Sequence, residues 1–455
     1  MKLVYDIKDK PNFGKLVIFA IQQLLAIMAA TLVVPIIING NAGLEGDNAM
    51  STAAALFGAG VGTLVYVLFT RKKSPVFLGS SFAFIGSMTS AFAGAVSIAA
   101  GYAGLILGAV LAGLVYVLIA IIVKFAGVGW INKVMPAVVI GPTVAIIGLS
   151  LAGNAVGDLK KANAGGDYRV AIICGLVTLI VTMLASTYGK KSMKLIPFII
   201  GILAGYATAG IITAIGMATD NPALLVSDFS PITALWADGV TLNTFVSVPD
   251  FTFMTAFKGI KDIDFTYIST LIAAYVPVAF VVFAEHIADH KNISSIIEKD
   301  LLEDPGLSNT LLGDGVGSMA GALFGGCPNT TYGESVACVA ITRNASVATI
   351  ITAAVLAIII SFCNPFVAFV NSIPSCVMGG VCMALYGFIA VSGLKMIQKV
   401  DLEKNRNLFV VSAILIAGIG GLSISFGKVT ITTIACALIL GIVINLILSK
   451  EKDEA

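Results

Sequence analysis

The sequence predicts an all-α polytopic membrane protein, and its composition is the first reason. Of its 455 residues, 58% are hydrophobic and only 11% are charged, whereas a soluble domain carries about 25% charged residues. A soluble fold of this length cannot bury so much apolar surface, because it must also keep a polar exterior. The formal net charge of +2 is too small for the strongly basic surface that binds a polyanion such as a nucleic acid. Composition therefore excludes a soluble enzyme, a disordered chain and a nucleic-acid-binding protein.

Fourteen apolar segments are the second reason, because a helix of about 20 apolar residues crosses a bilayer. Residues 1–15 lack the apolar core and cleavage site of a secretory signal, so the first segment is expected to remain as a span. The expected spans are residues 15–38, 50–70, 75–91, 103–123, 134–152, 168–187, 193–216, 265–288, 309–326, 330–343, 346–370, 374–394, 407–426 and 430–449.

The distribution of basic residues orients these spans. With the N-terminus in the cytoplasm, 21 of the 27 Lys and Arg residues fall on the cytoplasmic side and 6 fall outside. Cytoplasmic loops of membrane proteins carry this excess. The sequence therefore predicts a multi-pass protein of the plasma (inner) membrane with both termini in the cytoplasm and its longest loop, 217–263, outside.

The two halves of the chain resemble each other weakly. Residues 79–83 read Gly-Ser-Ser-Phe-Ala, and residues 329–333 read Asn-Thr-Thr-Tyr-Gly. Residues 135–141 likewise match 373–379, each with a Pro in second place and a Gly at the end. Seven spans per half is an odd number, so the halves are expected to be two inverted repeats. Secondary transporters are built in this way, with the substrate held between interrupted helices of the two halves.

The third and tenth spans, 75–91 and 330–343, are short and rich in Gly, Ser and Thr. Their Ser-Ser-Phe and Thr-Thr-Tyr runs contain strand-forming residues before a helical stretch. We therefore expect a short extended break in each span, the two breaks meeting in mid-membrane and each leading into a half-helix. Extended backbone at that depth is tolerated where it lines a cavity. Its free backbone groups and the half-helix N-termini would then face a ligand.

Carboxylates lie within the expected spans or directly at their ends, and a charge in the membrane costs roughly 2.5–3.5 kcal/mol. Glu285 and Asp289 are four residues apart and share one helical face. Glu334 follows the second break. Such groups cannot all ionise cheaply in one cavity, so at least one is expected to gain and lose a proton. Glu285 and Glu334 together suit the N–H and C=O edge of a planar heterocycle; the alternative is a polar contact between helices.

Other polar residues within the spans suggest structural roles. Asp314, in a Gly-Asp-Gly run, is expected to join two helices, and Arg343 is expected to anchor the end of the tenth span. His286 and His290 have the i, i+4 spacing of zinc-binding helices, and a metal site is therefore an alternative interpretation. The sequence offers neither His-Glu-x-x-His nor an obvious third ligand, so we expect no metal and no other cofactor. His290 is expected to be exposed to solvent at the cytoplasmic end of its span.

The remaining motifs give no support to an enzyme. The sequence contains no Gly-x-Ser-x-Gly run, which carries the nucleophile of many hydrolases. The seven cysteines lie in apolar stretches without a Cys-x-x-Cys pair, so they are expected to be small core residues.

At these residues the sequence resembles the nucleobase–ascorbate transporter (nucleobase:cation symporter-2) family, and most closely its bacterial uracil permeases. The most specific stretch is Pro-Asn-Thr-Thr-Tyr-Gly-Glu at 328–334, followed by Ile-Thr-Arg at 341–343. Four further stretches support it and bring the resemblance to almost the whole chain: residues 78–84, 284–286, 304–307 and 377–380.

The resemblance implies an architecture and a mechanism. Spans 1–4 and 8–11, in residues 1–128 and 263–372, would form a core domain. Spans 5–7 and 12–14, in residues 129–262 and 373–455, would form a gate domain, with a cytoplasmic tail at the end. The core would move against the gate like an elevator, in a homodimer, and import would be coupled to protons.

The resemblance also implies the site residues. Uracil would be held by Glu285 and Glu334, with backbone contributions at Phe82, Ala83, Tyr332 and Gly333. Proton coupling would involve both glutamates and Asp289, which stands where close uracil permeases have a histidine.

Departures from the family pattern leave alternatives open. Gln22-Gln23 stands where Gln-His is usual, and Ser335 and Ala337 replace an Asn and a Gly. Asp289 is a residue that purine carriers often have at its position. The preferred interpretation is therefore a proton-coupled uracil importer, and the alternative is a xanthine or urate permease. An anion exchanger of the same fold is less favoured, because it would need positive charge where Glu334 stands.

Overall fold

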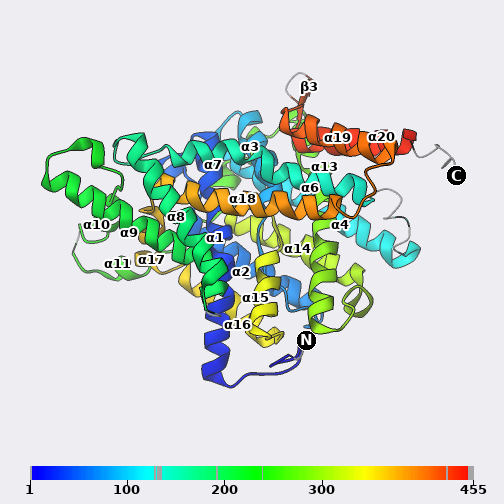
Figure 1. Ribbon diagram of the computed structural model, residues 1–455, viewed down its shortest axis with the longest axis horizontal. Coiled ribbons are helices and arrows are strands. Elements are labelled where there is room, and N and C mark those ends of the chain that lie inside the picture. Colours follow the sequence, from blue (N-terminus) through cyan, green and yellow to red (C-terminus); the bar gives the residue numbers. More distant parts are fainter. Residues whose placement is uncertain are drawn as a thin grey trace.

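The computed structural model of the protein describes residues 3–127, 130, 136–190, 193–237, 239–426 and 429–448. Helices make up most of it (Figure 1). Several sequence features lie outside these residues: the domain boundary at 128/129, the start of the fifth span and the tail from residue 449 onwards. Seven side chains named in or counted for the sequence analysis also lie outside them. They are Lys2, Lys133, Met135, Lys191, Lys428, Lys450 and Lys452.

The first half of the chain begins with long helices that start at side-chain caps. The side chains of Asn12, Ser51 and Ser97 each accept a hydrogen bond from the backbone N–H three residues later. This bond stabilises the first turn of the helix. The helices of this half are α1 (Phe13–Ala42), α2 (Thr52–Phe69), α3 (Ile85–Gly94), α4 (Ile98–Ala126), α6 (Ala137–Ser150), α7 (Ala152–Leu159), α8 (Tyr168–Tyr188) and α9 (Pro197–Ala218).

The second half follows a segment of three short helices, α10 (Ser230–Ala234), α11 (Leu242–Phe245) and α12 (Thr252–Gly259). Its helices are α13 (Phe265–Ile297), α14 (Leu307–Gly325), α15 (Gly333–Thr342), α16 (Val347–Ile360), α17 (Asn364–Asn371), α18 (Ser375–Ile397), α19 (Asn405–Ile419) and α20 (Thr433–Leu448). Four short strands complete the described chain: β1 (Leu78–Ser80), β2 (Asn329–Thr331), β3 (Ile424–Phe426) and β4 (Val429–Ile431).

Each of the fourteen predicted segments overlaps at least one helix. In the described part of the chain, eight helical segments are long and apolar enough to cross a membrane, judged by length and composition. They are Phe13–Ala42, Gly46–Phe69, Ile98–Ala126, Ala137–Leu159, Tyr168–Tyr188, Pro197–Ala218, Phe265–Ile297 and Ser375–Ile397. The prediction of a helical, membrane-spanning chain is therefore confirmed at this level.

The two extended breaks predicted for the third and tenth spans are present, and they meet. β1 and β2 pair antiparallel, with Leu78 opposite Thr331 and Ser80 opposite Asn329. Two further hydrogen bonds extend the pairing, from Ser81 N to the carbonyl of Pro328 and from Tyr332 N to the carbonyl of Phe77. After β1 the chain turns through a short 3₁₀ segment, Phe82–Phe84, into α3, and after β2 it enters α15. The pair therefore joins the two halves of the sequence.

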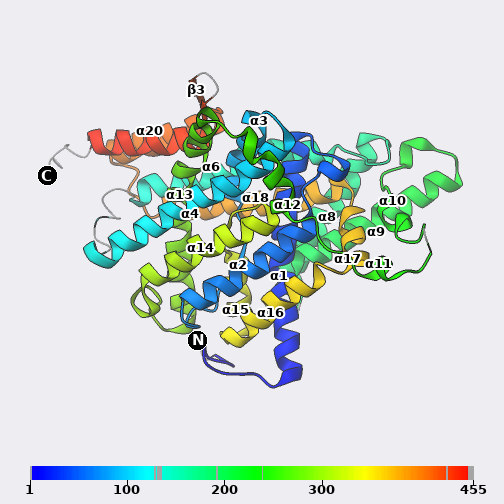
Figure 2. The ribbon, with the colours of Figure 1, turned by 180° about the vertical axis from the view of Figure 1, so that it is seen from behind.

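Close helix packing holds this strand pair in place. α2 lies between α14 and α16, as Figure 2 shows from behind. A Cβ added to Gly62 of α2 would stand 2.7 Å from the carbonyl oxygen of Gly317 of α14. Small residues at such crossings let helices approach closely in membrane proteins. Asn329 of β2 also donates from Nδ2 to the carbonyl of Gly58 at 3.1 Å, which fixes the strand against α2.

The segment before α1 forms hydrogen bonds with the second half of the chain. Val4 N donates to the carbonyl of Arg343, and Ala345 N donates to the carbonyl of Tyr5. Lys299 Nζ lies 2.5 Å from Asp6 Oδ2, and this hydrogen bond holds the pKa of Asp6 below its ordinary value. Arg343 ends α15 with a left-handed backbone conformation, and its role as an anchor at the membrane interface stays a prediction.

Candidate functional site

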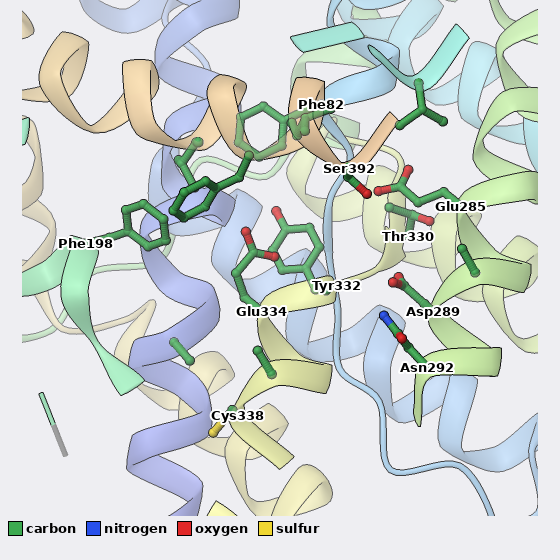
Figure 3. A pocket seen from close by; sticks show the side chains of 18 of the residues that line it. Phe82, Phe198, Glu285, Asp289, Asn292, Thr330, Tyr332, Glu334, Cys338 and Ser392 are labelled. Carbon is green, nitrogen blue, oxygen red and sulfur yellow. The ribbon is translucent and has the colours of Figure 1, made fainter. Parts of the chain in front are cut away.

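A cavity of about 430 Å³ lies where the strand pair meets α13 and α18 (Figure 3). This volume is within the usual range for small-molecule sites. All seven residues that the sequence analysis proposed for the site line it: Phe82, Ala83, Glu285, Asp289, Tyr332, Gly333 and Glu334. We call it the carboxylate cavity, after Glu285, Asp289 and Glu334.

The three carboxyl groups come from two helices. Glu285 and Asp289 project from one face of α13, as their spacing predicted, and Glu334 lies in the first turn of α15. Figure 3 shows the two α13 carboxylates on one side and Glu334 on the other, next to Tyr332. A carboxylate in the first turn of a helix interacts favourably with the helix dipole. The carboxyl groups on opposite sides of the carboxylate cavity can accept hydrogen bonds when ionised and donate them when protonated.

Tyr332 positions the start of α15. Its hydroxyl donates to the carbonyl of Ser80 at 2.6 Å, across the strand pair. The ring lies against the backbone of Gly79, and a Cβ at Gly79 would overlap it. Glycine is therefore required opposite the ring. Because Gly333 and Glu334 follow directly, the Tyr332 contacts also set where these two residues face the cavity.

Asp289 is tied to the second strand. Thr331 Oγ1 donates to Asp289 Oδ2 at 2.9 Å. This bond links α13 to the last residue of β2, so the carboxylate and the strand hold each other in position. Asn292, one turn further along α13, also lines the cavity next to Asp289 (Figure 3).

Two departures from the family pattern contact each other. Gln23 Nε2 of α1 donates to Ser335 Oγ of α15 at 2.5 Å. The same hydroxyl accepts the N–H of Phe77 at 2.9 Å. Gln23 and Ser335 are far apart in the chain, so their sequence positions do not predict this contact. In the structure they form one buried contact behind the start of α15.

Asp314 and the two histidines lie behind the cavity and do not line it. Asp314 Oδ2 is 2.7 Å from His286 Nδ1, which joins α14 to α13 as expected. His290 Nε2 is 2.7 Å from the Tyr66 hydroxyl. The prediction that His290 is wet was wrong: it is fully buried, because α13 continues to Ile297 rather than ending near residue 288.

No metal site was found in the part of the chain that the structure describes: it holds no group of three or more His, Cys, Asp or Glu side chains placed for a metal ion. The seven cysteines are all free, and six are buried. The prediction that they are small core residues is confirmed for the six buried cysteines, and Cys363 is only partly buried.

Apolar walls from other helices complete the cavity, and sequence reasoning missed them. Phe198 of α9 and Phe388 of α18 both line it. Phe82 packs edge to face on Tyr386 of α18, with ring centroids 5.9 Å apart. Phe82 also lines a second pocket, of about 320 Å³, that contains Asn154 of α7. No signal marked the two wall phenylalanines, because they lie among many apolar residues of their spans.

Solved membrane transport proteins share this fold at low sequence identity. The transmembrane domain of the cyanobacterial bicarbonate transporter BicA is 13% identical, with a TM-score of 0.57, and the match covers 97% of this chain and 100% of that one. The murine Solute Carrier 26 family member A9 anion transporter, in its inward-facing state, is 10% identical with a TM-score of 0.63, over 97% of this chain and 69% of that one. At these identities the likeness is one of fold.

Sequence comparisons give the family. A model described as "Permease family" (Xan_ur_permease) matches residues 14–427. The uracil permease of Bacillus subtilis (strain 168) is 36% identical, covering 100% of this chain and 97% of that protein. Those of Bacillus caldolyticus and Escherichia coli (strain K12) are 37% and 34% identical, covering 100% and 97% of this chain and 96% and 93% of those proteins.

The chain therefore belongs to the permease family. It is a multi-pass membrane transporter and not an enzyme, which confirms both predictions and the resemblance seen in the sequence.

Proposed function

We propose that the protein is a secondary active transporter that imports uracil by proton symport. The observation that carries the proposal is the placement of Glu285 and Glu334 across one cavity, next to the ends of the paired strands. The names of its relatives add support, since the Bacillus subtilis and Escherichia coli proteins are uracil permeases.

The cavity suits the chemistry of uracil. A uracil edge offers N–H donors and C=O acceptors, which an ionised carboxylate and a protonated carboxyl complement. Backbone groups at Phe82, Ala83, Tyr332 and Gly333 line the cavity and would provide further hydrogen bonds. Aromatic walls are typical of sites that hold planar ligands.

The number of carboxyl groups in the cavity supports coupling to protons. Glu285, Asp289 and Glu334 share one cavity, and like charges in a medium of low dielectric repel each other. Proton uptake at one of them with substrate, and release on the other side of the membrane, would couple the two fluxes. We assign Asp289 the relay role, because Thr331 holds it between the strand pair and the cavity.

We propose that the protein has fourteen spans in two inverted repeats. It would lie in the plasma membrane as a homodimer, with both termini in the cytoplasm. Residues 1–128 and 263–372 would form the core, and 129–262 and 373–455 the gate. In this division the strand pair and all three carboxylates belong to the core, while Phe198 and Phe388 of the cavity wall belong to the gate. An elevator movement of core against gate would carry the bound base, together with Phe82 of the core, past Phe198 and Phe388 of the gate.

Two alternatives share the fold. A xanthine or urate permease is favoured by one observation, the aspartate at position 289. An anion exchanger has the fold of the bicarbonate transporter domain, but the three carboxylates around the cavity outnumber its one lysine, Lys194, and disfavour a bound anion.

Thermal stabilisation of the purified protein by uracil, xanthine, urate, hypoxanthine and sulfate tests the proposal. A ligand at a hundredfold excess over Kd stabilises the folded state by about 2.7 kcal/mol. We expect a shift with uracil alone. A shift with xanthine or urate would move the assignment to a purine carrier, and a shift with sulfate alone would move it to an anion exchanger.

A further inference from the structure

A third cavity, of about 560 Å³, lies beside the carboxylate cavity, between α13, α18 and the start of α6. Three lysines line it: Lys291 of α13, Lys395 at the end of α18 and Lys399 just after it. Its lining residues, all from the described chain, include no acidic side chain. We call it the lysine chamber.

The charge of this chamber goes beyond what orientation in the membrane requires. Basic residues collect at cytoplasmic ends of spans, but that tendency does not make them converge on one cavity. Lys395 and Lys399 are four residues apart, a spacing at which like charges repel on a helix. No ion pair involves any of the three chamber lysines within the described residues, whereas Lys73 and Lys299 both have an aspartate partner. A bound anion would neutralise this positive charge.

The lysine chamber adjoins the carboxylate cavity. Four residues line both: Ala288, Asn292, Ser392 and Met396. Figure 3 shows Asn292 next to Asp289 on this shared wall. Lys291 lies six residues after Glu285 on α13, which is about 9 Å along the helix axis. One ligand can therefore have one end at the carboxylates and the other at the lysines.

We propose that the two cavities together bind a nucleoside monophosphate, with its base in the carboxylate cavity and its phosphate in the lysine chamber. The part of the proposal that concerns the base (the base half) rests on the proposed function. The part that concerns the phosphate (the phosphate half) rests on the lysine chamber alone. Lysine ammonium groups bind phosphate as point charges. The amide of Asn292 and the hydroxyl of Ser392 lie on the shared wall, where the ribose would pass. A ligand held at both ends blocks transport, so it acts as an inhibitor.

Competition with radiolabelled uracil on the purified full-length protein tests this site. The competitors are uridine 5′-monophosphate and uridine, which differ only in the phosphate. The variant is the double substitution Lys395→Gln/Lys399→Gln, and the matched control is Lys124→Gln, an exposed lysine at the end of α4. We expect the monophosphate to compete about tenfold better than uridine in the wild type and the control. That advantage should disappear in the double variant, with uracil affinity unchanged.

Equal competition by the two compounds in the wild type overturns the proposal. So does stabilisation by vesicles of anionic phospholipid that is lost in the double variant while the monophosphate does not compete, because the chamber then holds a lipid headgroup. If uracil itself does not bind, the proposed function fails, and thermal stabilisation by inorganic phosphate tests the chamber separately. Stabilisation that the double variant loses upholds the phosphate half, and its absence in the wild type overturns it.

Discussion

Gln23 donates a hydrogen bond of 2.5 Å to the hydroxyl of Ser335, and the two residues lie 312 positions apart in the chain. The bond joins α1 to the start of α15, directly behind Glu334. Because Ser335 also accepts the N–H of Phe77, one hydroxyl group fixes three segments around the carboxylate cavity.

Replacing this hydroxyl should loosen the cavity. Ser335→Ala leaves two buried donors, Gln23 Nε2 and Phe77 N, without an acceptor, and each unsatisfied donor costs about 1–3 kcal/mol. We expect a lower thermal unfolding temperature and weaker uracil binding. Ser295→Ala, at an exposed serine of α13, is the control and should change neither. An unchanged unfolding temperature in Ser335→Ala would show that the contact does not stabilise the fold.

Glu334→Gln should remove uracil binding while preserving the fold. The amide has the size of the carboxyl group but cannot accept at both oxygens, and a lost charge-assisted hydrogen bond costs about 1.5–3 kcal/mol. We therefore expect uracil affinity to fall at least tenfold, measured by thermal stabilisation or calorimetry. Glu303→Gln, at an exposed glutamate, should bind as the wild type does. Wild-type affinity in Glu334→Gln would remove this residue from the proposed site.

Asp289→Asn should separate binding from transport. The amide oxygen can still accept from Thr331 Oγ1, so the strand pair and the base-binding groups should stay in place. The amide does not exchange a proton, so uptake driven by a pH gradient should fall much more than uracil affinity does. Uptake into proteoliposomes, measured between pH 5 and pH 8, checks this. Transport with an unchanged pH profile would rule out the relay role of Asp289.

Gly79→Ala should disturb the site through Tyr332. The added Cβ overlaps the Tyr332 ring, so either the ring or strand β1 must move, and overpacking of this kind costs typically 1–3 kcal/mol. We expect lower thermal stability and weaker uracil binding. Gly387→Ala is the matched control, because its Cβ would meet no atom within 4 Å in α18. If both variants behave alike, close packing at Gly79 is not what positions Tyr332.

The Asp6–Lys299 pair should make stability depend on pH at the acid end. Lys299 holds the pKa of Asp6 below its ordinary value, so the pair stabilises the protein above the unfolded-state pKa. This contribution is lost as the pH falls through the lower, folded-state pKa. The difference in unfolding temperature between wild type and Asp6→Asn should therefore be constant above about pH 5, begin to fall near pH 4, and vanish only below the folded-state pKa of Asp6. Glu303→Gln serves as the control carboxyl.

Local patterns in the sequence were enough to predict the helices, the two breaks and the three carboxylates. Hydropathy identifies spans well, because backbone groups in lipid must be satisfied within a helix. Charges in a span are rare, so Glu285 and Glu334 were conspicuous. The strand-forming runs before α3 and α15 predicted the β1–β2 pair, and its antiparallel register is a finding of the structure.

What the sequence could not predict depends on contacts between distant residues. Phe198 and Phe388 look like any other apolar residue of a span, since lipid and protein interior are both apolar. His290 was expected at the end of its span, but helix α13 extends past the apolar stretch and buries it against Tyr66. The lysine chamber needs the relative positions of α13 and α18, which no local pattern provides.

The pairing of β1 with β2 has a consequence for synthesis of the chain. The strands are separated by about 250 residues, and they pair with each other, although the N–H of Leu78 donates to Thr63 of α2 instead. When the ribosome has completed only the first half, the other backbone groups of β1 lack their partners in the lipid, where unpaired groups are costly. The newly inserted half must therefore wait, shielded by water, lipid headgroups or an insertion factor, until residues 329–331 emerge. A prematurely terminated chain would then contain spans but no closed substrate site, so it could not form a leak specific for the transported base.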